Sequence, residues 1–116
     1  MIVTIILQVL LGLGFLMFGY QKFTSEDMKK GFEYFGYGDS FRLFTGFFEI
    51  LSAIIIIVGI WVKPLATIGG IMIVATMIGA IITHVKIKDQ VKNMAMPFTL
   101  FLLGAVVAIM NWSALF

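Results

Sequence analysis

Long apolar stretches alternate with shorter polar links along the whole chain. The apolar stretches cover residues 2–20, 41–61, 65–85 and 97–115. Each comes close to the roughly 20 residues that an α-helix needs to cross the hydrocarbon core of a bilayer. Lipid admits only helices or closed barrels, and these continuous runs lack the alternation of barrel strands. The pattern predicts an all-α fold in which residues 1–116 form a single four-transmembrane-helix bundle.

The longest link, residues 21–40, has a helical pattern of its own. Thr24 or Ser25 can cap a helix that starts at Glu26, because their hydroxyl oxygens accept hydrogen bonds from free backbone N–H groups. Beyond this cap, apolar positions recur at helical spacing opposite charged ones. The apolar positions are Met28, Phe32 and Phe35, and the charged ones are Lys29, Lys30 and Glu33. The link therefore predicts a short amphipathic helix at the membrane interface, with a disordered loop as the alternative.

The second link is much shorter. Residues 62–64 leave room only for a tight turn, so we expect the second and third spans to be antiparallel neighbours. Pro64 and Pro97 each suit the first turn of the helix that follows, where a backbone N–H has no partner within the helix.

Composition supports a membrane protein and excludes other classes. Hydrophobic residues make up 61% of the chain and charged ones 12%, against about 25% charged in soluble domains. Membrane lipid is therefore the expected surrounding. The net charge of +2 comes from lysines confined to the links, which excludes a nucleic-acid-binding groove. The absence of cysteine excludes disulfides and a thiol nucleophile.

The basic residues also predict an orientation. Seven of them lie in or beside the first and third links: Lys22, Lys29, Lys30, Arg42, Lys86, Lys88 and Lys92. The opposite face carries only Lys63 and the amino terminus. The positive-inside rule then places the basic links in the cytoplasm and both termini outside, in a multi-pass protein of the cell membrane. Trp61 and Trp112 both fall on the outer face, where an aromatic belt is expected.

Small residues mark expected helix contacts, because close backbone approach is how helices associate in lipid. Ala66 and Gly70 form one small-xxx-small pair in the third span, and Ala75 and Gly79 form another. Glycines also leave one region of the first span without bulky side chains. These glycines are Gly12, Gly14 and Gly19. Each of them is equally consistent with the ordinary glycine content of membrane helices.

Glu49 lies inside the second apolar stretch. A carboxylate there costs roughly 2.5–3.5 kcal/mol on insertion scales unless it is paired, protonated or hydrated. Arg42 lies seven residues earlier on the same helical face, and Lys22 and His84 end the first and third spans at the same membrane surface. If these three spans are mutual neighbours, all four side chains converge in the cytoplasmic half of the bundle, with Ser52 close by.

Each of these polar groups has a structural and a functional interpretation. Glu49 either fixes helix packing by accepting hydrogen bonds or serves as a proton carrier or ligand-binding carboxylate. His84 can cap helix carbonyls instead of contacting a ligand. One histidine and one glutamate do not make a metal site, which needs three or four ligands, so no metal is predicted. Gln8 and Asn111 are expected to form hydrogen bonds between helices nearer the outer face.

Several short motifs carry a family resemblance. They are F-G-Y-Q-K at the end of the first span, G-F-F-E-I-L in the second, G-x-W-x-K-P-L at the second link and T-H-x-K at the end of the third span, with Asp89 downstream. In this order and spacing the chain resembles the DoxX-like family of small four-helix membrane proteins over nearly its whole length. The residues that match the family pattern are Gly19, Lys22, Glu49, Pro64 and His84.

The resemblance implies a function in broad terms. Family members are linked to membrane redox work, including a subunit of an archaeal thiosulfate:quinone oxidoreductase and complexes with superoxide-detoxifying enzymes. More distant relatives are assembly chaperones or cargo receptors. We therefore expect an accessory membrane protein for redox or stress homeostasis. Its polar pocket around Glu49 would bind a partner protein, such as a soluble or membrane oxidoreductase, or an apolar small molecule such as a quinone.

Two alternatives stay open at this point. The first is a quinone-linked oxidoreductase subunit, although the sequence has no flavin, haem or iron–sulfur signature and predicts no bound cofactor. The second is a proton-coupled small-molecule transporter that uses Glu49 and His84. Because four short helices rarely enclose a pathway, that function would require a dimer, the simplest homo-oligomer. Whether the chain has catalytic activity is left open by the sequence.

Overall fold

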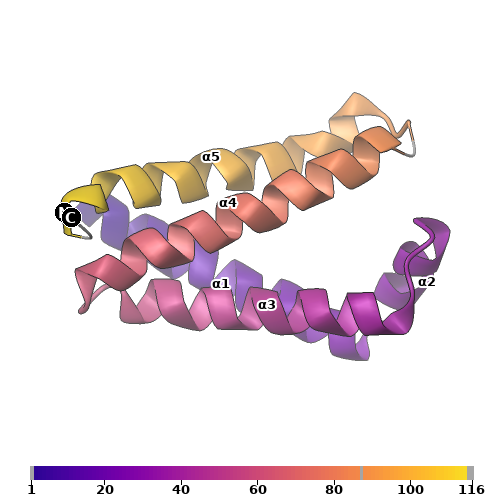
Figure 1. The fold of residues 1–116 in the computed structure, drawn as a ribbon, viewed down its shortest axis with the longest axis horizontal. Helices are drawn as coiled ribbons and strands as arrows, with labels where there is room; N and C mark the ends of the chain where they lie inside the picture. Colours follow the sequence, from indigo (N-terminus) through magenta and orange to yellow (C-terminus); the bar gives the residue numbers. More distant parts are fainter. Residues whose placement is uncertain (1, 87, 115–116) are drawn as a thin grey trace.

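Helices account for nearly all of the chain, as the apolar runs predict. The computed structural model describes residues 2–86 and 88–114, and Figure 1 shows their arrangement. The elements are α1 (Ile2–Thr24), α2 (Glu26–Tyr34), α3 (Asp39–Val58), α4 (Lys63–Lys86), η1 (Val91–Met94), α5 (Ala95–Met110) and η2 (Trp112–Ala114). Four helical segments in the described residues are long and apolar enough to cross a membrane. The expected all-α fold, with a short helix between the first two spans, is confirmed.

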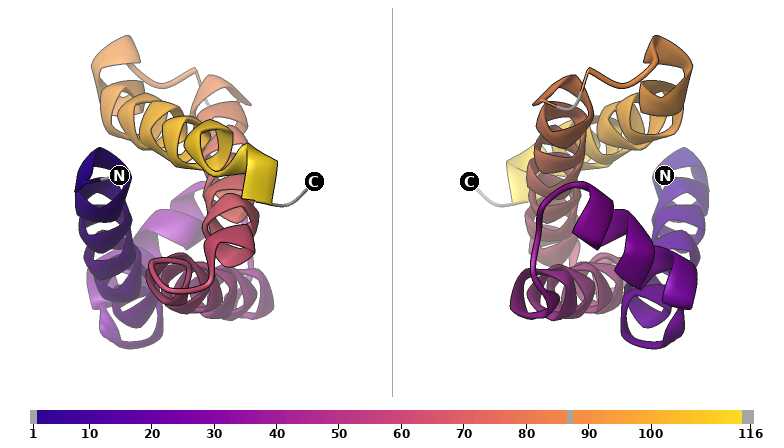
Figure 2. Two further views of the ribbon diagram at one scale, coloured as in Figure 1. Left: turned by 90° about the vertical axis from the view of Figure 1, so that its left-hand side faces the viewer. Right: turned by 90° about the vertical axis from the view of Figure 1, so that its right-hand side faces the viewer.

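The four long helices pack as a ring. α1 packs on α3, α3 on α4 and α4 on α5, while α1 also contacts α5. Seen from either end, α1 and α4 lie on a diagonal (Figure 2). The condition that the first three spans be mutual neighbours is therefore met for the pairs α1–α3 and α3–α4 but not for α1–α4. The two ends of the described chain lie at the same end of the bundle (Figure 1).

Glycines set the distance between neighbouring helices. A Cβ atom on Gly19 would lie 2.7 Å from the carbonyl oxygen of Gly46, and one on Gly70 would lie 2.8 Å from that of Gly104. The backbones of α1 and α3, and of α4 and α5, can approach this closely only because these side chains are absent. The prediction for Gly79 is wrong, since a Cβ atom there meets nothing within 4 Å. Gly14 is equally open.

A buried polar cluster ties three helices together near the termini. The side-chain amide of Gln8 donates to the carbonyl oxygen of Ile56 at 2.9 Å, and Asn111 donates to the hydroxyl of Thr4 at 2.9 Å. These bonds confirm the expected contacts between helices. The side chain of Asn111 also donates to the carbonyl oxygen of Val107 at 2.9 Å, which accepts the backbone N–H of Asn111 as well. α5 ends at Met110, short of the predicted boundary at residue 115.

The link between α1 and α3 folds as its pattern predicts. The hydroxyl of Ser25 accepts a hydrogen bond from the N–H of Met28 at 3.3 Å and so caps α2. The helix ends before Gly36, whose φ of +85° lies in the left-handed region that glycine adopts at little cost. The two prolines also lie in first turns, Pro64 in α4 and Pro97 in α5. The short 3₁₀ helix η1 ahead of α5 was not predicted.

Candidate functional site

A cavity of about 640 Å³ occupies the end of the bundle that carries α2. Figure 1 shows the α1–α3 and α4–α5 pairs close together near the termini and farther apart at this end. Aromatic side chains from α1, α2, α3 and the α2–α3 link form much of the cavity wall. They are Phe18, Phe32, Phe35, Tyr37, Phe41, Phe44 and Phe48. α4 contributes smaller groups, among them Thr76, Gly79, Ala80, Thr83 and His84.

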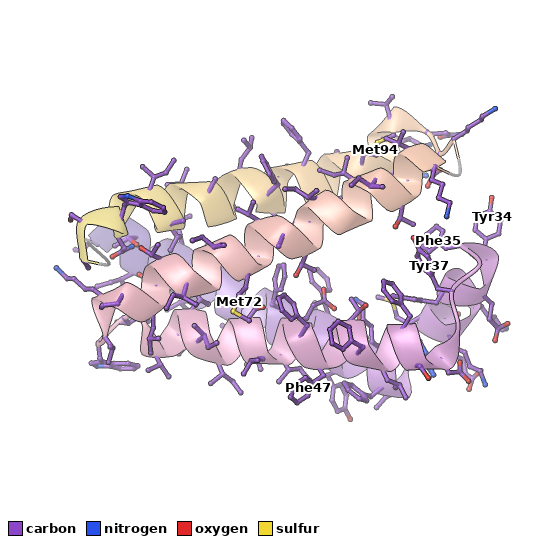
Figure 3. All side chains as sticks on the ribbon, in the orientation of Figure 1. Tyr34, Phe35, Tyr37, Phe47, Met72 and Met94 are labelled. Atoms are coloured by element: carbon purple, nitrogen blue, oxygen red, sulfur yellow. The ribbon has the colours of Figure 1, made fainter. Side chains whose placement is uncertain are left out.

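Two of these aromatic residues lie between α2 and α4. In Figure 3, Phe35 and Tyr37 point from the α2 segment toward the α4 side, whereas Phe47 points away from the bundle. The hydroxyl of Tyr37 lies 2.8 Å from that of Thr83. Thr83 itself donates to the carbonyl oxygen of Gly79, so Tyr37 is the donor in the bond between them. This bond attaches the α2–α3 link to α4 beside the cavity.

An ion pair between Lys22 and Glu49 lies in the cavity wall. Lys22 is in the last turn of α1 and Glu49 is in the middle of α3. The ammonium Nζ lies 2.6 Å from the carboxylate Oε1, and the two residues are only 7% and 3% exposed. The close approach of Gly19 to Gly46 brings the two helices near enough for this contact. Nζ of Lys22 also lies 5.9 Å from the centre of the Phe32 ring, which is a favourable cation–π distance.

Lys22 is the basic residue that pairs with Glu49. A charge so far from water needs a partner, because desolvation in a low-dielectric region is expensive. Of the candidates considered, only Lys22 forms an ion pair with Glu49 among the described residues. Oε1 accepts no hydrogen bond of good geometry from any other described group. The carboxylate is therefore held by a single charged neighbour and borders open cavity space.

Arg42 and Ser52 lie near the pair without entering the cavity wall. Arg42 donates through Nη1 to the carbonyl oxygen of Lys22 at 3.2 Å and through Nη2 to Asp39 at 3.3 Å. It thus holds the end of α1 against the start of α3. The hydroxyl of Ser52 donates to the carbonyl oxygen of Phe48 in its own helix at 2.7 Å. Neither side chain borders the cavity.

His84 borders the same cavity from α4 and has its own acidic partner. Its Nδ1 lies 2.8 Å from Oδ2 of Asp89, and its ring stands edge-on to Phe35 at 5.7 Å between centres. Asp89 also accepts hydrogen bonds from Asn93 and from the N–H of Gln90, each at 2.8 Å. These bonds, that from Asn93 first and that from His84 second, hold the pKa of Asp89 below its usual value of 3.8.

The structure therefore brings the predicted residues together only in part. Lys22 and Glu49 are in direct contact, and His84 shares their cavity but pairs with Asp89. No cluster of three or more metal-ligating side chains occurs within residues 2–86 and 88–114. Neither the aromatic wall nor the role of Asp89 was predicted from the sequence. Asp89 stands five residues after His84, which was the available signal.

Comparisons with known proteins give one match. The model of the DoxX-like family matches residues 6–108, which is most of the chain. Comparisons with curated proteins and with solved structures give no match.

Proposed function

The chain belongs to the DoxX-like family, and from this premise we propose that it is a multi-pass membrane accessory protein that binds an apolar small molecule. Its binding site would be the cavity that Lys22 and Glu49 border. Because four helices are apolar enough to cross a membrane, the cavity between them would be within reach of molecules dissolved in the bilayer. The accessory role in redox or stress homeostasis, beside an oxidoreductase partner, rests on the family resemblance.

The nature of the cavity carries the proposal. Its volume of about 640 Å³ falls in the range of roughly 300–1,000 Å³ that is usual for small-molecule sites. Such sites combine a mostly apolar wall with a few polar groups that orient the ligand. Here aromatic rings supply the wall and the Lys22–Glu49 pair supplies one polar group.

A quinone is the ligand class that fits these features best. Its flat ring can stack against aromatic side chains. Its carbonyl oxygens can accept a hydrogen bond from the ammonium of Lys22, which has three donors and forms an ion pair with Glu49. A quinone with an apolar tail also partitions into the bilayer, so it would reach the cavity without crossing water.

Identifying the small molecules that copurify with the protein tests this proposal. The protein is extracted gently from its own membrane, and bound apolar molecules are identified by mass spectrometry of a solvent extract. We expect a quinone-type molecule with the wild type and much less with Glu49→Gln, which loses the charge but keeps the shape. Ser52→Ala is the control, because Ser52 is buried in the same helix and does not border the cavity.

Either of two results would overturn the proposal. In the first, no apolar molecule is bound to any of the three purified proteins. In the second, all three proteins retain the same amount of a bound apolar molecule. Copurification of an oxidoreductase with the wild type would support the accessory role.

We propose in addition that the α2 end of the bundle faces the cytoplasm. Of the eight basic residues, seven lie in or beside the links at that end and only Lys63 lies at the other. Because the chain has no cysteine, single cysteines report location cleanly. A membrane-impermeant thiol reagent added to intact cells should label Lys63→Cys and spare Lys30→Cys. The reverse labelling would refute the orientation.

A further inference from the structure

The Asp89–His84 pair gives the cavity a second polar group on the wall opposite α1. The two oxygens of Asp89 have different partners. Oδ1 accepts hydrogen bonds from the N–H of Gln90 and from Nδ2 of Asn93, whereas Oδ2 lies against Nδ1 of His84, all at 2.8 Å. With three partners the carboxylate has a fixed orientation. The imidazole is held by its Nδ1 edge and by the neighbouring Phe35 ring.

This arrangement determines which ring nitrogen of His84 carries the proton. An ionised carboxylate can only accept hydrogen bonds, and the lowered pKa of Asp89 keeps it ionised at neutral pH. Nδ1 must therefore be the protonated nitrogen that donates to Oδ2. In the neutral imidazole the other nitrogen, Nε2, then has a free lone pair. No hydrogen bond joins Nε2 to any residue in the described part of the chain.

We propose that Nε2 of His84 accepts a hydrogen bond from a hydroxyl group of the ligand, so that the cavity selects an apolar molecule with an aromatic hydroxyl. This inference rests on the proposed function, because it assumes that a small molecule enters the cavity. Asp89 does not border the cavity and acts through His84, as a positioning residue. A hydroquinone has the required chemistry, because it combines a flat apolar ring with hydroxyl donors. Its second hydroxyl oxygen can accept a hydrogen bond, which the proposed contact with Lys22 requires.

The selection should reverse when the tautomer of His84 reverses. In Asp89→Asn the bonds from Gln90 and Asn93 still require an oxygen at the Oδ1 position, which places the amide nitrogen where Oδ2 was. That nitrogen can only donate, so Nδ1 of His84 must become the acceptor and the proton must move to Nε2. The cavity would then present a donor in place of an acceptor.

The experiment compares two probes of nearly equal shape, decylhydroquinone and its dimethyl ether, which has no hydroxyl. Binding of each to the detergent-solubilised protein is measured by native mass spectrometry. We expect the wild type to prefer the hydroquinone by roughly five- to tenfold, the value of one hydrogen bond. Asp89→Asn should lose or invert this preference. Asn93→Ala, which leaves the carboxylate in place, should retain its direction.

The outcomes separate this inference from the proposed function. If neither probe binds the wild type, the proposed function fails and the inference fails with it. If both probes bind the wild type equally, or if Asp89→Asn keeps the wild-type ratio, the cavity binds apolar molecules but His84 does not select their hydroxyl group. The inference alone is then wrong.

Discussion

At the scale of single residues, the Lys22–Glu49 ion pair joins the last turn of α1 to the middle of α3. The two charges lie 2.6 Å apart and are almost fully buried. Removing one partner of such a pair leaves the other charge without compensation, which is far more costly than removing both. The pair therefore acts as a unit, and its worth is measurable only by comparing single and double variants.

We predict that Lys22→Met lowers the free energy of unfolding by about 3 kcal/mol, because Glu49 is left as an unpaired buried carboxylate. The double variant Lys22→Met/Glu49→Leu should recover a large part of that loss. Unfolding in mixed detergent micelles measures all four members of the cycle. A double variant as unstable as the sum of the two single variants would show that the ion pair does not couple the helices.

The lowered pKa of Asp89 predicts how the hydrogen bonds of the α4–α5 link depend on pH. Its pKa is lower in the folded state than its ordinary value of 3.8, so the hydrogen bonds of the α4–α5 link are complete above that pH and are lost as the pH falls through the folded pKa. The amide resonance of Gln90, which donates to Asp89, should titrate with a midpoint below 3.8. Asn93→Ala removes the hydrogen bond that lowers the pKa of Asp89 most, so the midpoint should rise toward 3.8 in this variant. A wild-type midpoint at or above 3.8 would contradict this account.

At the scale of the helices, the contact between α1 and α3 positions the ion pair. A Cβ atom on Gly19 would lie 2.7 Å from the carbonyl oxygen of Gly46, which is backbone and cannot move aside on its own. Gly14 lies in the same helix, but a Cβ atom there meets nothing within 4 Å. The two glycines are therefore a matched pair for separating close packing from helix propensity.

We predict that Gly19→Ala lowers the free energy of unfolding by about 1–3 kcal/mol, the usual cost of overpacking a tight contact. Gly14→Ala should leave it unchanged or raise it by up to about 1 kcal/mol, because alanine is the better helix former. Unfolding of both variants under the same detergent conditions makes the comparison. Equal losses in the two variants would mean that the α1–α3 distance is not set by Gly19.

At the scale of the whole molecule, the bundle has two different ends. Near the termini a polar cluster of Thr4, Gln8 and Asn111 ties α1, α3 and α5 together. At the α2 end the helix pairs lie farther apart and enclose the cavity (Figure 1). The bundle is therefore closely packed at one end and holds a partly open cavity, bordered by α2, at the other.

The sequence predicts the helices well because the physics of lipid leaves few choices. Runs of about 20 apolar residues must be helical, and a buried Glu49 must find one of a few basic partners. The direction of the aromatic side chains could not be predicted in this way. Phe44 and Phe47 differ little as sequence positions, yet Phe44 borders the cavity and Phe47 points away from it. That difference depends on how α3 is rotated against α4, which no local pattern encodes.

The wrong prediction of a helix contact at Gly79 has the same cause, because local spacing does not encode how two helices are placed against each other. Its spacing from Ala75 predicts a helix contact, but α4 and α3 are apart at that level and Gly79 borders the cavity. The partner of His84 was missed for a related reason. Asp89 reaches it through the turn after α4, where Lys88 has a φ of 56° that no apolar pattern indicates.

The most direct test of the account is to obstruct the cavity and ask whether the protein still carries an apolar molecule. Gly79 borders the cavity and has free space around its Cβ position, so the ring of Gly79→Phe should occupy part of the cavity and obstruct the site without disturbing the backbone. Gly14→Phe is the control, because Gly14 also has free space but does not border the cavity. Native mass spectrometry of gently extracted protein should find a bound apolar molecule on the wild type and on Gly14→Phe but not on Gly79→Phe. The same bound molecule on all three proteins, or on none, would contradict the claim that this cavity is the binding site.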